Sequence, residues 1–377
     1  MSITLFSSGK HSIEVVDFTT QYDSFKIVRF DANHFTDELW DRFFKLREEL
    51  HHEFNPQDPL HDRKTLRKLF TAPEHMYESW RHLVIKCGTN KEELVGFVTI
   101  SWRNQKSTDY EKEKHLGNLS LTLREDIRRQ GVGTRVTHLM ALKLQEQGKT
   151  KILGDYSTES GKVFCRKLKF TVASERALNR LYVKEIDWEL MRTWQNVPAR
   201  QDGVTIDIYE VMPDEIIKEY CTLYTNVSAT APDYASGDFE AHERMSPQDR
   251  RASEAYLREL GIRWVTALAK DIDGLLVDVS EIYYNPSLPT GIEQEMTAVL
   301  PSQRGRGVGK WLKAELVLFA RERFPKAVFY TTGNANNNEA MLAINHKMGY
   351  RKHKSHALVS ILTQDLVQNT LEMLKKD

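Results

Sequence analysis

An internal repeat constrains the fold of this 377-residue chain more than any single motif does. Residues 119–133 read LSLTLREDIRRQGVG and residues 295–309 read EMTAVLPSQRGRGVG, so a cationic glycine turn follows an alternating segment in both. Alternation with period two predicts a β-strand. Because similarity at this spacing marks a duplicated unit, we expect the chain to fold into two copies of one domain.

The landmarks around the two turns recur in the same order. ELVGFVTI at 93–100 corresponds to LLVDVSEI at 275–282, and FCRKLKF at 164–170 corresponds to INHKMGY at 344–350. After each turn, apolar residues recur at every fourth position, which predicts an amphipathic helix. These residues are Val132, Val136, Met140 and Leu144 in the first half, and Val308, Leu312 and Leu316 in the second. The order of strands and helices predicts an α+β or mixed α/β domain, present twice.

A polar segment separates the two copies. WQNVPARQDG at 194–203 contains Pro198 and Gly203 and few apolar residues, which is the composition of a linker. We therefore predict five parts of the chain. They are an N-terminal extension (1–25), a first domain (26–193), the linker (194–203), a second domain (204–365) and a C-terminal helical tail (366–377).

The charge balance restricts the possible partners. Lys+Arg and Asp+Glu are equal at 53 each, so no global field would attract nucleic acid or an anionic membrane. Three widely spaced cysteines favour a reducing compartment over a disulfide framework. No apolar run approaches the length of a membrane span, and residues 1–25 lack the features of a signal peptide. We expect a cytoplasmic monomer or homodimer that binds neither nucleic acid nor membranes.

The glycine turn in QRGRGVGK (303–310) has the features of an anion site. A turn that leads directly into a helix leaves the first N–H groups of that helix unpaired, and the helix dipole favours a phosphate there. The glycines let the backbone approach the anion, while Arg304, Arg306 and Lys310 add positive charge. The predicted ligand is therefore a phosphorylated cofactor. A Walker loop is excluded because Trp311 follows GK, and a dinucleotide fingerprint because the third glycine comes one residue early.

The remaining pattern, Arg/Gln-x-x-Gly-x-Gly, resembles that of the GNAT superfamily of acetyl-CoA-dependent acyltransferases. Residues 304–309 and 128–133 both match it, each between a predicted strand and an amphipathic helix. TGNANNNEAMLAINHKMGYR at 332–351 is similar to tandem GNAT proteins of the mycothiol synthase type. The resemblance implies an α/β (α+β) fold of two tandem domains, each a mixed, largely antiparallel sheet flanked by helices. It also implies acetyl-CoA as cosubstrate and no metal.

In that resemblance the glycine turn grips the CoA pyrophosphate and the preceding strand offers its backbone to the pantetheine. The family's cofactor-binding positions fall here on Thr297, Val299, Arg304, Gly305, Arg306, Gly307, Val308, Gly309, Lys310 and Asn338. The expected reaction moves an acetyl group to a primary amine of a small molecule or peptide, by direct attack in a ternary complex.

Acetyl transfer to an amine needs a base, a donor to the developing oxyanion and a proton for the leaving thiolate. The period-two count places Val299, Thr297, Glu295 and Glu293 on one face of the predicted strand. The family's general-base glutamate falls on Glu293 in the resemblance. Glu293 and Glu295 are therefore the predicted catalytic residues of the second domain.

The first half departs from the family pattern at the corresponding positions. The same count along its strand gives Leu123, Leu121, Leu119 and Gly117, none of which carries a carboxylate. The glycine of the family's Gly-Phe or Gly-Tyr landmark is present as Gly349 in the second half and replaced by Lys169 in the first. We therefore predict that the first domain keeps the scaffold and lacks the catalyst.

At two further family positions the first half also departs from the pattern, and the second half departs only at the tyrosine. The helix asparagine falls on Asn338 in the second half and on Thr158 in the first. The tyrosine that protonates the thiolate in the family falls on Asn345 and on Cys165, so neither half has it. Cys165 has no base near it in sequence and is expected to be a structural thiol. The proton donor stays open among Tyr283, Tyr284 and Tyr350.

Other interpretations depend on loops and on the missing tyrosine. A non-catalytic acyl-CoA-binding or regulatory protein is the alternative function. An aminoacyl transferase is disfavoured, because the neutral charge balance gives no sign of tRNA binding. The run HHEFNPQDPLHD (51–62) matches no standard zinc spacing and is predicted to be a solvated loop. In the loop 229–250, four residues are candidates for selecting a cationic amine: Asp233, Tyr234, Asp238 and Glu240.

Overall fold

The structure is a computed structural model, and it describes residues 15–72, 76–89, 91–229, 244–336 and 338–376. The chain forms two compact units. The first unit comprises Met1–Val172 together with Leu358–Asp377, and the second comprises Ala173–Ala357. Each unit is one mixed, largely antiparallel sheet flanked by helices, as the sequence predicts. No helix in the described ranges is both long and apolar enough to cross a lipid bilayer.

The sheet of the first unit has one parallel junction among antiparallel ones. Its strands, in spatial order, are β1 (Val15–Thr19), β2 (Ser24–Phe30), β3 (Tyr77–Cys87), β4 (Glu92–Arg103), β5 (Leu116–Leu123), β6 (Lys151–Tyr156) and the end of β13 (Arg351–Leu362). The parallel pair is β5 with β6. The helices are α1 (Asp37–Phe54), α2 (Arg63–Thr71), α3 (Tyr110–Glu113), α4 (Val132–Glu146), α5 (Glu159–Lys167) and α12 (Thr363–Leu374).

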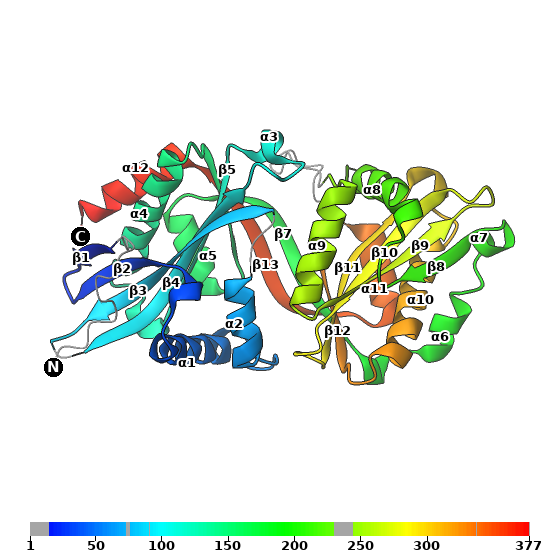
Figure 1. Ribbon diagram of the computed structural model, residues 1–377, viewed down its shortest axis with the longest axis horizontal. Coiled ribbons are helices and arrows are strands. Elements are labelled where there is room, and N and C mark those ends of the chain that lie inside the picture. The colour runs from blue at the N-terminus through cyan, green and yellow to red at the C-terminus, as the bar shows by residue number, and fades with distance from the viewer. Residues whose placement is uncertain (1–14, 73–75, 90, 230–243, 337, 377) are drawn as a thin grey trace. The chain divides into compact units, whose positions relative to one another are not determined.

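Two apolar cores lie on opposite faces of this sheet. The side chains of β3 alternate between them, so that Leu83 packs under α1 and Val84 packs under α4. Figure 1 shows α1 and α2 on one side of the strands and α4 and α12 on the other. Polar N-cap residues begin several of these helices; Thr36, for example, accepts a hydrogen bond from Leu39 N–H at the start of α1.

The second unit repeats this architecture. Its strands, in spatial order, are β7 (Thr171–Tyr182), β12 (Phe329–Ala335), β11 (Gly291–Val299), β10 (Leu276–Tyr284), β9 (Arg263–Lys270) and β8 (Thr205–Tyr209). The helices are α6 (Trp188–Thr193), α7 (Pro198–Gln201), α8 (Asp214–Ala229), α9 (Pro247–Glu259), α10 (Val308–Arg323) and α11 (Glu339–Met348). Leu268 and Val279 pack toward α8, while Val265 and Ile282 pack in the core that contains α10.

The two units are not the two halves of the sequence, because the last strand of each repeat passes into the other unit. From β7, Tyr182 pairs with Phe329 of β12 in the second unit. In the first unit, Thr363 N–H donates to Thr150 O at 2.9 Å, and Leu366 of α12 is buried beside α4. Residues 173–193 therefore lie with the second unit and residues 358–377 with the first. The linker-like composition of residues 194–203 does not indicate which strands pass into the other unit.

Candidate functional site

A cavity of about 900 Å³ lies in the first unit, where two parallel strands separate. β5 and β6 pair only between Leu116–Asn118 and Lys151–Leu153, and beyond this point they diverge. The cavity is lined by the free half of β5, the first glycine turn, the start of α4, the end of β6 and α5. Its size is within the range of small-molecule and cofactor sites. Strand backbone that has no neighbour on one side is available to a ligand.

The first glycine turn presents backbone N–H groups and cations to this cavity. Gly131 precedes α4 in the left-handed conformation, with φ of 78°, and has no side chain that could cap the helix. Arg129 and Arg135 line the cavity on either side of it, and Lys167 does so from α5. Arg128 holds the turn by donating to Leu123 O at 2.8 and 3.0 Å. The arrangement fits an elongated ligand with phosphate groups.

The reactive side chains expected of a catalyst are replaced around this cavity. Thr158 is the N-cap of α5 and accepts a hydrogen bond from Gly161 N–H at 3.1 Å. Burial raises the pKa of the Cys165 thiol to about 11, so it stays protonated and unreactive. Lys169 has a φ of 65°, the left-handed conformation that a glycine would adopt without strain. The first half thus keeps the backbone geometry of the repeat without its characteristic side chains.

The second glycine turn has the same backbone conformation as the first. Gly305 and Gly307 have φ of 81° and 88°, and Gly307 stands directly before α10. Arg306 donates to Asp202 at 2.8 Å and also to the Gln303 side-chain carbonyl. The second turn thus has the backbone conformation of the first, and Asp202 of the linker contacts it.

A β-bulge in β11 changes which side chains share a face. The register with β10 shifts between Ser280 and Ile282, so β11 carries one extra residue between Gln294 and Thr297. Ser280 Oγ contacts Thr297 Oγ1 at 2.7 Å and accepts from Gln294 Nε2 at 3.2 Å. Thr297 therefore lies on the face of Gln294. The period-two count was wrong on this point, because the bulge adds a residue to the alternation.

Val299 also lies away from the two glutamates, on the side of α10. A Cβ placed on Gly309 of that helix would lie 3.1 Å from Val299 Cγ2. Glu293 pairs with Tyr283, which in turn pairs with Trp264. Directly paired residues share a face, and α9 covers the Trp264 ring. The predicted base and the predicted cofactor residues of this strand thus occupy opposite faces.

Glu293 is reached by solvent yet stands among dense protein. Its side chain is exposed by surface area, while burial of its surroundings raises the pKa of its carboxyl above the ordinary value. Neighbouring protein thus disfavours the charged form of the carboxyl, although solvent reaches the side chain. Glu295 is exposed and lies within the bulge.

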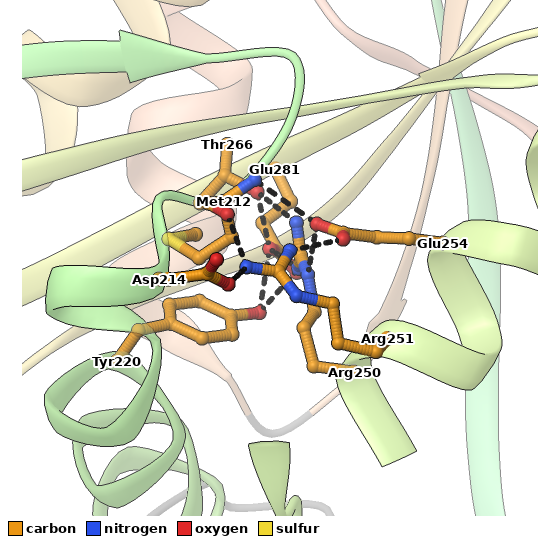
Figure 2. A network of polar contacts seen from close by, with 8 residues as sticks. All are labelled: Met212, Asp214, Tyr220, Arg250, Arg251, Glu254, Thr266 and Glu281. Atoms are coloured by element: carbon orange, nitrogen blue, oxygen red, sulfur yellow. Dashed lines mark hydrogen bonds and ion pairs between the residues drawn. The ribbon is translucent and has the colours of Figure 1, made fainter. Parts of the chain in front are cut away.

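A buried ionic network lies under the same face of the sheet (Figure 2). Arg250 of α9 is 0% exposed and stacks on the Trp264 ring at 3.4 Å from its centroid. Its guanidinium donates to Glu281 at 3.1 Å and to Tyr220 Oη at 2.7 Å. It also donates to Thr266 at 3.1 Å and to Glu254 at 3.0 Å.

This network fixes α8 and α9 to the strands that precede the bulge. Tyr220 of α8 donates to Glu281 at 2.8 Å, and Gln294 Nε2 donates to Glu281 O at 2.7 Å. Desolvation, followed by the Glu281 charge, raises the pKa of Tyr220 well above its usual value, so its hydroxyl remains a donor. Sequence reasoning missed these residues, although polar Thr266 and Glu281 within apolar strands are a signal that could have indicated them.

The other predicted positions have structural roles. Asn338 is the N-cap of α11 and accepts from Met341 N–H at 3.3 Å. Asn345, at the position of the family's tyrosine, is buried and donates to Asn334 at 2.7 Å. Of the three candidate tyrosines, Tyr284 and Tyr350 are buried in the apolar core around α10. Of the three, only Tyr283 pairs directly with Glu293, across β10 and β11.

The two loops with candidate ligand-binding residues add few contacts to the site. His51 Nε2 lies 2.8 Å from Asp58 O. Within the described ranges, no three His, Cys, Asp or Glu side chains come together in a way that could hold a metal ion. The four candidate acceptor residues between Asp233 and Glu240 lie outside the described residues.

Comparison with known proteins relates the chain to acetyltransferases. Residues 40–160 match the model of the acetyltransferase (GNAT) family. A search of curated proteins gave no significant match. Among solved structures, a tandem GNAT protein from the clavulanic acid biosynthesis pathway superposes with a TM-score of 0.69 at 16% identity, over 90% of this chain and 98% of that one.

Two other solved structures have a related fold. A GCN5-related N-acetyltransferase from Sphaerobacter thermophilus has a TM-score of 0.58 at 11% identity, over 85% of this chain and 92% of that one. A glucosamine N-acetyltransferase region of a fungal multi-domain GH3 β-N-acetylglucosaminidase has a TM-score of 0.60 at 11% identity, over 90% of this chain and 38% of that one. At these identities the likeness establishes the fold, and it does not extend to substrates.

Proposed function

We propose that the chain, which matches the GNAT family model over residues 40–160 and has the fold of a tandem GNAT protein, transfers an acetyl group from acetyl-CoA to a primary amine of a small molecule or peptide. The observation that carries this proposal is the cavity of the first unit. It lies where the family's fold separates two strands, beside a glycine turn with open N–H groups. The family model matches this same part of the chain.

The residues around the cavity fit the three chemical parts of CoA. The free edge of β5, Leu119–Leu123, can exchange backbone hydrogen bonds with the amides of pantetheine. The first N–H groups of α4 and the cation of Arg129 suit the pyrophosphate. Arg135 and Lys167 provide further positive charge for a phosphate. The same turn recurs in the second unit, where we propose that the acetyl donor of the chemical step binds.

The side chains suited to the chemical step lie in the second unit. Glu293 accepts the proton of the attacking amine, and its raised pKa brings it closer to that of the amine. Backbone N–H groups of β11 near Thr297 and Val299 are the proposed donors to the oxyanion. Tyr283 pairs with Glu293 across β10 and β11, and we propose it as the donor that protonates the thiolate.

The bonds and charges balance in this reaction. The amine nitrogen forms a bond to the acetyl carbon, the carbon–sulfur bond breaks, and its electron pair leaves with sulfur. The amine gives one proton to Glu293, and the sulfur receives one from Tyr283 or from water. We propose that the cosubstrate for this step is held at the second turn by the residues predicted from the sequence, 304–310, together with the strand backbone at Thr297 and Val299.

A specific observation also favours the alternative of a non-catalytic acyl-CoA-binding protein. The half with the open cavity has no carboxylate on its strand, whereas the half with Glu293 has linker residues against its turn. If the second turn holds no acetyl-CoA, the chain binds CoA in the first unit without transferring the acetyl group.

A panel of amines decides between the two functions. The full chain is incubated with acetyl-CoA and each amine, while free thiol release and product mass are followed. Acetylated product that is lost in Glu293→Gln and kept in Glu322→Gln, an exposed glutamate on α10, supports the enzyme. Acetyl-CoA binding without product from any amine class would favour the binding protein.

A further inference from the structure

The linker packs on the helix that follows the second glycine turn. Trp194, Val197 and Ala199 are buried in the same apolar core as Val308 and Trp311, which form the first turn of α10. Figure 1 shows α6, which directly precedes these residues, beside α10. A segment with the composition of a loose connection is thus part of the second unit.

Two linker side chains reach the turn itself. A Cβ placed on Gly307 would lie 2.9 Å from Val197 Cγ1, so the side chain of Val197 already fills the space beside this glycine. Asp202 accepts the Arg306 guanidinium at 2.8 Å. A carboxylate of the chain therefore binds one of the cations that were predicted to bind a phosphate.

Further contacts attach the linker to the body of α10. Gln195 donates to Glu315 Oε1 at 3.0 Å, and the same oxygen accepts from Trp311 Nε1 at 2.7 Å. Arg200 lies over the Trp311 ring at 5.7 Å from its centroid. The linker is thus held just before Val197 and again between Val197 and Asp202.

The corresponding part of the first unit is arranged differently. Gln130 stands where Arg306 stands in the second unit, and its amide donates to the backbone of Asp126 at 2.6 Å. Both Gly131 and Gly133 line the cavity there. The two turns have similar backbones, yet the first faces a cavity and the second contacts Val197 and Asp202.

We propose that the linker is an intramolecular gate on the second glycine turn. Asp202 acts as an internal anion on Arg306, and Val197 occupies the space beside Gly307. The second unit then takes the phosphates of a CoA ligand only when the linker has moved, whereas the first unit is always open. This inference rests on the proposed function, since it concerns access of the same cosubstrate to the site of Glu293.

Amide hydrogen exchange of the full chain, titrated with CoA, reports each turn separately. Peptides spanning 125–136 and 301–312 follow the first and the second turn. In the wild type, we expect protection of the first turn at low CoA, and protection of the second only at higher concentration. Asp202→Asn should lower the CoA concentration needed at the second turn by about 2- to 5-fold, which corresponds to an exposed ion pair. Val197→Ala should lower it by about 10-fold, because two buried methyl groups are removed.

Matched variants separate the gate from general destabilisation. Glu210→Gln removes an ion pair with Arg323 at the other end of α10, and Val204→Ala removes the same methyl groups from the same core. Neither should change the second turn's response to CoA. The Asp202 side chain is 57% exposed, so Asp202→Asn should fold normally even if Val197→Ala does not.

Equal protection of both turns at one CoA concentration in the wild type would overturn the gate. So would an unchanged second turn in Asp202→Asn. The amine panel is independent of this result: a responsive gate without any acetylated product would refute the proposed enzyme and leave the gate standing. Product formation in a chain whose two turns respond alike would refute only the gate.

Discussion

Arg250→Met tests whether the ionic network beneath the Glu293 face holds this part of the second unit together. Methionine has an apolar side chain of similar length to the arginine stem. The substitution therefore removes only the cation that donates to Glu281 and Glu254. Glu281 is 2% exposed, so its carboxylate would remain in protein without its ion-pair partner. Removing one partner of a buried pair costs about 3–5 kcal/mol, because the remaining charge is not compensated. We expect a loss of unfolding free energy of this size.

The assay is urea unfolding of the full chain, followed by circular dichroism and tryptophan fluorescence. Arg251→Met is the matched control, since Arg251 is the next residue on α9 and its side chain is 35% exposed. It should cost about 1 kcal/mol or less, as partly exposed ion pairs do. Adding Glu281→Gln to Arg250→Met should restore about 1–3 kcal/mol, because the uncompensated charge is then gone. A cost below about 1 kcal/mol for Arg250→Met, or no rescue by the second change, would refute the reasoning.

Three further predictions follow from single residues. If Glu293 is the base, activity rises with pH as its carboxyl ionises. Glu293→Gln should lower kcat/KM by about 100- to 10,000-fold, with partial recovery at alkaline pH, where the amine deprotonates by itself. A pH–rate profile with Glu295→Gln as the control measures this, and full activity of Glu293→Gln at neutral pH would exclude Glu293 as the base. Burial raises the pKa of Asp278 from 3.8 to about 7, so the unfolding free energy should fall as pH rises from about 4 to about 7 and then level off. Asp278→Asn should weaken this pH dependence, which urea titrations at pH 5 and pH 8 measure. An unchanged difference in unfolding free energy between the two pH values would contradict the prediction. Lys169→Gly should raise the unfolding free energy by about 0.5–1 kcal/mol, since Lys169 has a φ of 65°. Gly349→Ala at the equivalent position should lower it by about 1–2 kcal/mol. Thermal melts should therefore show a higher Tm for the first variant and a lower Tm for the second, and any other result would contradict the prediction.

The repeat made most of the fold predictable from the sequence. A strand, a glycine turn and an amphipathic helix in the same order twice leave few alternatives, and the structure has β5 with α4 and β11 with α10 at these places. The pairing partner of the last strand was not predictable. β7 and β13 have the composition of ordinary strands, and the sequence contains no signal for the sheet in which each one pairs.

The candidate site was predictable only where local rules hold. Gly307 has the positive φ that its position in the motif requires. The faces of Thr297 and Glu293 were not predictable, because a bulge is set by the pairing of β11 with β10 rather than by β11 alone. The contact of Val197 with Gly307 depends on tertiary packing of a segment whose composition indicates a loop. The composition of a segment indicates its polarity better than it indicates where the segment packs.

The exchange of strands makes each unit depend on residues of the other repeat. Ile361 and Leu366 complete the core of the first unit, and Leu181 and Ile186 contribute to that of the second, so each fold requires residues from the other repeat. The first unit has a cavity and no carboxylate on β5, while the second has Glu293 and linker contacts at its turn. Because β7 leads through α6 directly into the linker, the strand that stabilises the second unit also brings Val197 to its turn. Access to the second turn is thus coupled through the chain to the pairing that holds the second unit together.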